Sequence, residues 1–175
     1  QKTAYEIRLS LVGSEMCIRD SVKGDDIVSA LEKNYATTIS FLKSIPEEKG
    51  DYSYAPGKWS VKQVIIHISD TERVFTYRAL SIARGDTTAL PGYDENIWAA
   101  NSAPEKRTIA DVTEEFSLLR QNTIHLFKTF GEEQFLRKGI ANSKPASIIA
   151  LAFVIAGHEL HHLNVLKERY GLQNI

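Results

Sequence analysis

The chain has 175 residues, a length that suits one domain and is short for two. Hydrophobic residues make up 43% and charged residues 25%, which excludes a disordered chain and provides enough apolar material for one sizeable core. The formal net charge is −1, so no basic surplus exists for binding phosphates, and we expect no nucleic-acid partner.

Cysteine content and hydropathy bear on the compartment. The single cysteine, Cys17, cannot form an internal disulfide, so the fold needs no oxidising environment. The most apolar stretch, Ser147 to Ala156, lasts only about ten residues, whereas a membrane span needs about 18. We therefore expect a buried helix there, no membrane partner and, because no leader-like segment is visible, a cytoplasmic location.

The first 21 residues are set apart from the rest. Apolar and polar residues alternate from Tyr5 to Leu11, a strand pattern without a strand partner if the remainder is helical. This segment also resembles the translated read-through of a sequencing-library adapter. We interpret residues 1–21 as a non-native segment, the alternative being a genuine N-terminal extension, and expect the domain to span residues 22–175.

Two helices are predicted in the first half of the domain. The first runs from about Asp26 to Ile45, where Pro46 stops it. The second begins after Ser60, which forms a capping-box pattern with Gln63, and ends at Gly85. Six residues of this second helix share the face that we expect to point into the core: Val64, His67, Thr71, Val74, Arg78 and Ile82.

Two more helices are predicted in the second half. The third begins near Thr108 and its apolar residues end at Phe130, before Gly131. Its expected core residues are Val112, Phe116, Leu119, Leu126 and Phe130. The fourth begins between Ser143 and Ser147, with Pro145 in its first turn, and runs to Tyr170.

Four amphipathic helices predict an all-α fold, a four-helix bundle. The second and third helices are separated by the long segment from Gly85 to Arg107. Loops of this length are usually functional or disordered, and this one is too apolar for disorder. We interpret it as a crossover that packs over one end of the bundle, with Asp94, Glu95, Asn96 and Trp98 as candidates for the mouth of a pocket.

The fourth helix carries a histidine pair with metal-ligand spacing. His158 and His162 are four residues apart, so their rings lie on the same face and can converge on one ion. His67 lies on the core-facing stripe of the second helix and is the candidate third ligand. Three neutral imidazoles suit Zn²⁺, Ni²⁺ or Fe²⁺ and leave a coordination position open, as catalytic sites do. The alternative is that each histidine is an ordinary hydrogen-bonded core residue, the more frequent case for a lone histidine.

The remaining histidines and the neighbouring acids leave alternatives open. His161 flanks the ligand face, and His125 is interpreted as structural. Glu159 completes an H-E-x-x-H pattern with His158 and His162, so a zinc-protease mechanism, with Glu159 facing a metal-bound water, is a minor alternative. Its third ligand would have to be a downstream residue such as Glu168, which lies about 80° off the ligand face.

Asp70 is the candidate catalytic residue. It lies within about 60° of His67 around the second helix, where a carboxylate could orient an imidazole or act as a base. The competing reading is that Asp70 forms an ion pair with a surface arginine or lysine.

Three motifs together resemble a known family. They are YAPGKWSVKQVIIH from Tyr54 to His67, DTER from Asp70 to Arg73, and AGHELHH from Ala156 to His162. The chain from about Ile27 to Gly171 is similar to the DinB-like, YfiT-type superfamily. The resemblance implies a four-helix bundle with a long crossover between its second and third helices. It also implies a divalent metal ion held by His67, His158 and His162, and frequent dimerisation.

The resemblance further implies an enzyme. Members of the family are described as metal-dependent hydrolases, and others as S-transferases or isomerases that use low-molecular-weight thiols. We therefore expect a small-molecule substrate and an open metal position that activates water or a thiol. The alternative is a non-catalytic, metal-binding or metal-stabilised bundle. Phe153, Ala156, Leu160 and Leu163 lie opposite the ligand face, so either the crossover or a second subunit must cover them. The resemblance favours a subunit, and we expect a homodimer with Phe153 and Leu160 near its interface.

Overall fold

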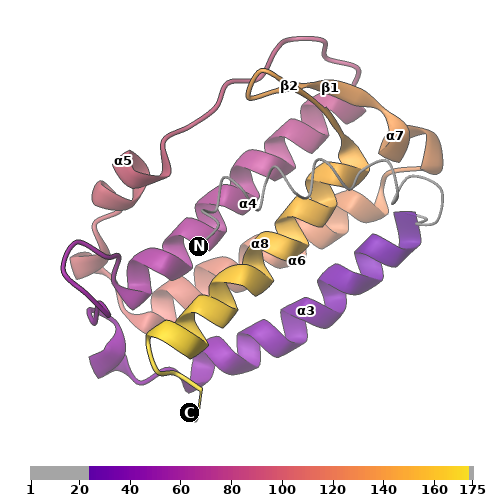
Figure 1. Cartoon of the computed structure of the whole chain (residues 1–175). Helices are drawn as coiled ribbons and strands as arrows, with labels where there is room; N and C mark the ends of the chain where they lie inside the picture. Colours follow the sequence, from indigo (N-terminus) through magenta and orange to yellow (C-terminus); the bar gives the residue numbers. More distant parts are fainter. Residues whose placement is uncertain (1–23, 174–175) are drawn as a thin grey trace.

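The computed structural model describes residues 24–173, and it has four long helices packed side by side (Figure 1). These helices are α3 (Gly24–Ser44), α4 (Val61–Ala83), α6 (Ile109–Lys128) and α8 (Ile148–Arg169). These four helices form a bundle, so the predicted all-α fold class is confirmed. Our interpretation of residues 1–21 falls outside the described residues.

The four long helices are not arranged around the bundle in chain order. α4 packs against α6 and α8, and α3 packs against the same two helices, so α3 and α4 lie on a diagonal. α4 and α6 run in the same direction, as Figure 1 shows. A chain joining two parallel helices must return along the bundle, which explains the length of the crossover between them.

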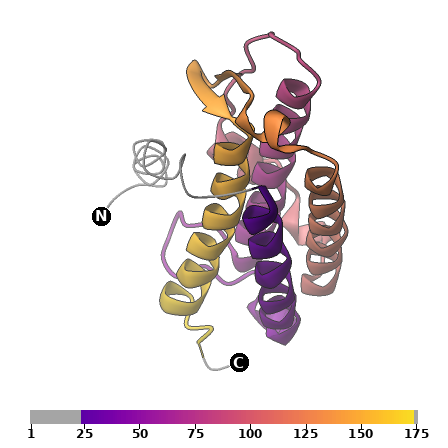
Figure 2. The ribbon, with the colours of Figure 1, turned by 90° about the vertical axis from the view of Figure 1, so that its right-hand side faces the viewer.

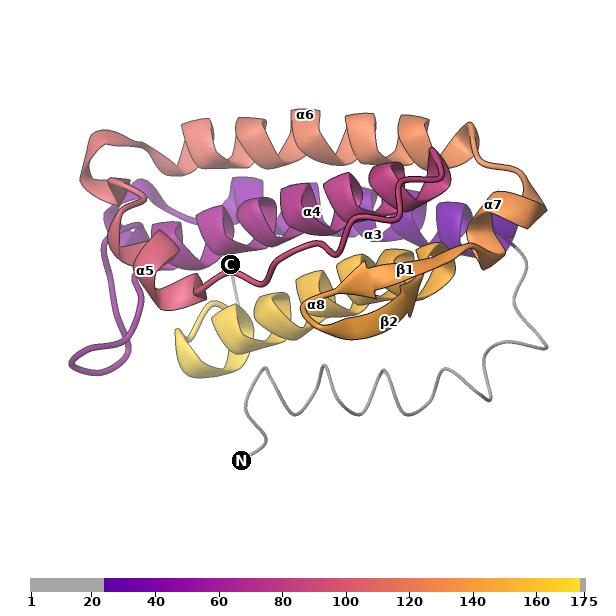
Figure 3. The same cartoon turned by 90° about the horizontal axis from the view of Figure 1, so that it is seen from above.

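The crossover runs along α4 rather than over one end of the bundle (Figure 3), so that part of our expectation was wrong. It contains α5 (Glu95–Ala100) and a short 3-10 helix, η2 (Pro104–Lys106). A hydrogen bond of 2.6 Å joins the hydroxyls of Tyr93 and Thr71, and Arg78 donates to the Pro91 carbonyl at 2.6 Å. These bonds fasten the crossover to α4 along its length.

Helix ends follow the capping residues in the sequence. Ser60 accepts from the Gln63 amide, and Gln63 bonds back to the Ser60 amide, the predicted capping box. Thr108 caps α6 by accepting a hydrogen bond from the backbone amide of Asp111, without a reciprocal bond. α4 and α8 are each followed by a glycine with positive φ, Gly85 and Gly171.

The segment between α6 and α8 differs from the prediction. It forms α7 (Glu132–Leu136) and a two-stranded antiparallel hairpin, β1 (Lys138–Ala141) and β2 (Lys144–Ser147), at one end of the bundle (Figure 2). Pro145 lies in β2, not in the first turn of the helix, because Ser147 is the N-cap of α8. Short edge strands tolerate proline, and periodicity cannot be read from four residues.

α8 is the described helix that is long and apolar enough to cross a membrane by length and composition. Half of its most apolar window is buried within the bundle, and that buried side carries His158, Glu159 and His162. Ala156 and Leu163, which we placed on the outer side, are also buried, at 7% and 3% exposure. The helix is therefore packed as a core helix, and only Leu160 of the four outer candidates is exposed.

The core divides into two apolar clusters along the bundle axis. Between them in sequence, each long helix contributes one member of a buried, hydrogen-bonded polar group: Thr38, Glu72, Arg120 and Glu159. We call these four residues the central polar cluster. It lies at the level where the histidines enter the core.

Candidate metal centre

Three histidines from two helices meet inside the bundle. His67 comes from α4, and His158 and His162 come from α8, one helical turn apart. One ring nitrogen of each residue lies within 4.8 Å of those of the other two. The Nε2 atoms of His67 and His158 are 3.0 Å apart, and the three ring centroids are 4.4–4.9 Å from one another. The structure thus brings together the three predicted ligands.

A divalent ion fits this donor set. Tetrahedral zinc with nitrogen ligands at 2.0–2.1 Å would separate those nitrogens by about 3.3 Å, which is close to the 3.0 Å between His67 and His158. All three histidines are at most 9% exposed, so their side chains are largely removed from water. Neutral imidazoles are the form that binds Zn²⁺, Ni²⁺ or Fe²⁺.

Trp59 covers one side of the triad. Its ring centroid is 4.7 Å from that of His67, and its backbone carbonyl accepts a hydrogen bond of 2.7 Å from Tyr170. Burial raises the pKa of Tyr170 to about 12, so the phenol stays protonated and keeps donating. The segment before α4 therefore contributes a fixed apolar wall to the centre, a role that the motif from Tyr54 to His67 did not reveal in the sequence.

A cavity of about 250 Å³ opens beside His162. Residues from the loop before α4, from α5 and from the end of α8 line it, including Asn96 and His161. Burial, and next the charge of Arg169, lower the pKa of His161, so its ring is neutral near pH 7. Of the loop residues proposed for a pocket mouth, Asn96 is in this lining, while Asp94 caps α5 by accepting from the Asn96 and Ile97 amides.

Asp70 lies three residues after His67 and is paired with Arg73, Oδ1 to Nη1, at 3.2 Å. Arg73 also binds Glu115 of α6 at 2.5 Å. Burial raises the pKa of Asp70, and Arg73 partly offsets this effect. The ion pair that we weighed against a catalytic role is therefore present, and the catalytic role stays a prediction.

Glu159 does not face the triad as a zinc-protease base would. Its side chain is fully buried, with one carboxylate oxygen accepting from Thr38 at 2.5 Å and the other from Arg120 at 2.6 Å. Glu168, the weak candidate for a downstream ligand, is exposed. The zinc-protease alternative is therefore wrong, because the chain uses Glu159 to hold Arg120 in the core.

Arg120 joins the two helices that carry the ligands. Its guanidinium, on α6, binds both carboxylate oxygens of Glu72 on α4 at 2.8–3.1 Å and Glu159 on α8 at 2.6 Å. Burial alone would lower the pKa of Arg120, but the two glutamates outweigh it and raise the pKa, so the charge is retained. The Arg120 guanidinium therefore holds α4 and α8 together near the part of each helix that carries a histidine ligand.

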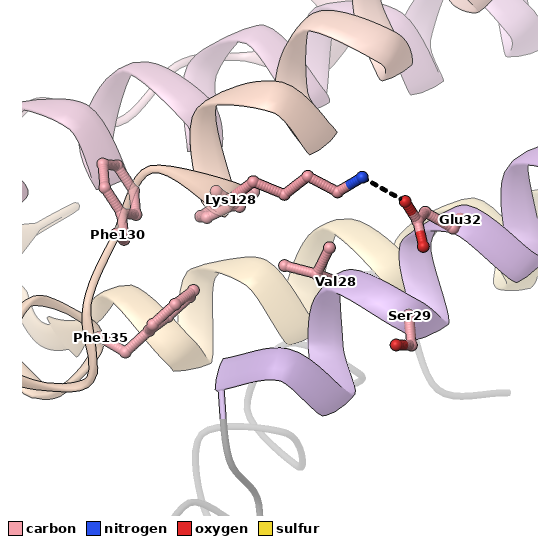
Figure 4. Close-up of a pocket in the computed structure, with 7 residues that line it drawn as sticks. Val28, Ser29, Glu32, Lys128, Phe130 and Phe135 are labelled. Atoms are coloured by element: carbon pink, nitrogen blue, oxygen red, sulfur yellow. Dashed lines mark ion pairs between the residues drawn. The ribbon is translucent and has the colours of Figure 1, made fainter.

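A second cavity of about 250 Å³ lies between α3, the end of α6 and α7. Phe127, Phe130 and Phe135 form its apolar wall, and Lys128 pairs with Glu32 at 2.6 Å across it (Figure 4). Its one carboxylate is already neutralised, and no histidine lines it. This cavity lacks a donor set for a metal ion, so the triad is the candidate site.

Comparisons with known proteins agree with this fold. A model of the family described as the DinB superfamily matches residues 30–166. The curated protein "Putative metal-dependent hydrolase YfiT" of Bacillus subtilis (strain 168) is 25% identical over 179 aligned residues, covering 94% of this chain and 97% of that protein. A solved structure of YfiT from Bacillus subtilis, described as a probable metal-dependent hydrolase with an unusual four-helix bundle topology, matches with a TM-score of 0.72 and 21% identity. That match covers 87% of this chain and 91% of the other.

Proposed function

The chain belongs to the DinB superfamily, and we propose that it is a metal-dependent enzyme that acts on a small molecule at its three-histidine centre. The observation that carries the proposal is the convergence of His67, His158 and His162 within 4.8 Å. The name of the Bacillus subtilis relative, a metal-dependent hydrolase, supports the same class.

Each group of the centre has a definite task. The three histidines supply neutral nitrogens, Trp59 shields His67 from water, and the cavity beside His162 admits the substrate. A Zn²⁺, Ni²⁺ or Fe²⁺ ion held by these histidines would lower the pKa of water or of a thiol and so supply a nucleophile near neutral pH. Hydrolysis and thiol-dependent transfer share these requirements.

We propose Asp70 as the base that takes up the proton released in this reaction. Replacing Asp70 with asparagine should lower kcat about 10²–10⁴-fold without loss of metal. Because burial raises the pKa of Asp70, its basic form prevails only above that pKa, so activity should rise with pH through it. The pH profile of kcat, measured with metal content, should lose this limb in Asp70→Asn.

Glu115→Gln is the matched control, because it removes the other partner of Arg73 and leaves Asp70 in place. It should retain kcat and keep an acidic limb, shifted to lower pH because the charge of Glu115 contributes to the raised pKa of Asp70. An Asp70→Asn protein with wild-type kcat would reduce Asp70 to a surface ion-pair residue.

A non-catalytic, metal-stabilised bundle is the competing function. The two are separated by assaying ester, amide and thiol-conjugation substrates on the metal-loaded protein, before and after chelation. Turnover that disappears with chelator and returns with metal supports the enzyme. If none of the three substrate classes is turned over and metal changes only the melting temperature, the result supports the non-catalytic bundle.

We also propose a homodimer formed through the outer face of α8. Leu160 is 43% exposed on that face, with the partly buried Phe153 two turns before it. An exposed leucine on the outer face of a core helix suits a twofold contact. Light scattering should give a dimer for the wild type at micromolar concentration and a monomer for Leu160→Glu. Leu118→Glu, at an exposed leucine of α6, should remain dimeric; a monomeric wild type would remove this proposal.

A further inference from the structure

The cavity beside His162 has an unusual charge composition. Two of the residues that line it are cations, Lys58 and Arg169, and the lining contains no carboxylate. The whole chain has a formal charge of −1, so this positive charge is a local concentration and not a general property of the surface. A divalent ion at the triad would add to it.

Arg169 is held at the cavity by neutral groups. It lies seven residues after His162, which places it on the same face of α8, about 10 Å along the axis. The guanidinium lies 5.9 Å from the centre of the Tyr54 ring, and its Nη1 is 3.4 Å from the Tyr54 hydroxyl. Tyr54 orients the guanidinium without neutralising it.

Lys58 is the second cation of the cavity lining. It lies in the loop before α4, next to Trp59, and is exposed. Within residues 24–173, neither Lys58 nor Arg169 takes part in any of the ion pairs. Lys62, four residues further on, shows the contrast, because it is buried and paired with Asp51 at 2.8 Å.

We infer that the substrate of this centre is an anionic small molecule, whose negatively charged group binds Arg169 and Lys58 while its reacting end faces the three histidines. This inference rests on the proposed metal-dependent function. Cationic walls around a concave site attract anions and raise their local concentration. The volume of about 250 Å³ lies below the 300–1,000 Å³ usual for drug-sized ligands, so the substrate is of small-metabolite size.

The test uses two thiols of similar size that differ in charge, 3-mercaptopropionate and 2-mercaptoethanol. Each is titrated into the Co²⁺-loaded protein, and binding is followed by the visible absorption of the metal. The quantity of interest is the ratio of the two dissociation constants in the wild type, divided by that ratio in Lys58→Gln/Arg169→Gln. This comparison cancels the intrinsic difference between the thiols.

We expect the wild type to favour the anionic thiol by about three- to tenfold more than the double variant does. The preference should shrink in 1 M salt, where charges are screened within about 3 Å. Arg84→Gln, which removes an exposed cation at the far end of α4, should keep the wild-type ratio. An unchanged ratio in the double variant would overturn the inference while leaving the metal centre intact.

A second readout separates this inference from the metal proposal. Trp98→Phe leaves Trp59, on the cavity wall, as the single tryptophan. If the protein binds no Co²⁺, the proposed function fails, and glutarate is titrated into the metal-free Trp98→Phe protein by fluorescence. Binding that is lost in Lys58→Gln/Arg169→Gln still supports an anion site, whereas no binding, or binding unaffected by these substitutions, refutes it.

Discussion

Replacing His162 with glutamine is expected to lower the bound metal from about one ion per chain to near zero. Glutamine is close in size to histidine but lacks the imidazole nitrogen, and His162 faces His67 and His158 with ring centroids 4.9 and 4.4 Å away. Two histidines on a helical turn, or one from each helix, bind a divalent ion far more weakly than three. Mass spectrometry of the purified protein measures the metal directly.

The same substitution should remove the stabilisation that metal confers. At a metal concentration of about 1,000 times Kd, binding adds about 4 kcal/mol to the unfolding free energy. For a domain of this size, 1 kcal/mol shifts Tm by about 2–4 °C, so metal should raise the wild-type Tm by about 8–16 °C. In His162→Gln, the difference between Tm with metal and Tm with chelator should be near zero.

Two other histidines serve as controls for this prediction. His125→Gln changes an exposed residue of α6, and His161→Gln changes the residue next to His162 that lines the cavity. Both proteins should keep the metal and its increment in Tm. If His162→Gln retained a full equivalent of metal while His161→Gln lost it, the ligand set would be wrong.

The sequence predicts the four long helices because periodicity and capping agree at their ends. Ser60, Thr108, Gly85 and Gly171 all occupy the expected terminal positions. The hairpin before α8 could not be predicted in this way, since its strands have four residues each and it packs locally at one end of the bundle. The path of the crossover depends on α4 and α6 being parallel, a tertiary property that helix periodicity does not contain.

The histidines were predictable because i, i+4 spacing on an apolar face is a local signal, whereas the central polar cluster was not. On α6 we expected Leu119 in the core, but the buried stripe passes from Phe116 to Arg120 instead. From sequence alone, a charged residue such as Arg120 is predicted to face solvent unless its partners are known. Glu72 and Glu159 lie on other helices, 48 and 39 residues away in the chain, so their pairing with Arg120 appears only in three dimensions.

Replacing Arg120 with methionine is expected to destabilise the bundle by about 3–5 kcal/mol, because it leaves Glu72 and Glu159 buried without their countercharge. Both carboxylates are at most 2% exposed, so water cannot substitute for the guanidinium. The corresponding loss in Tm is about 6–20 °C. Urea unfolding of the metal-free protein measures the free energy without the contribution of the metal.

The triple variant Glu72→Met/Arg120→Met/Glu159→Met is the matched control, since it replaces the charges by apolar side chains of similar length. Such replacements are often neutral or stabilising, so this protein should recover most of the stability lost in Arg120→Met.

The metal site of the triple variant tests what the charges do beyond stability. The guanidinium joins α4 to α8 through bonds of 2.6–3.1 Å, and methionines pack without that directionality. We therefore expect the triple variant to be as stable as the wild type but to bind Co²⁺ about tenfold or more weakly, as loss of the interactions supporting metal ligands does. Wild-type Co²⁺ affinity in the triple variant would show that apolar packing alone sets the distance between His67 and the pair on α8.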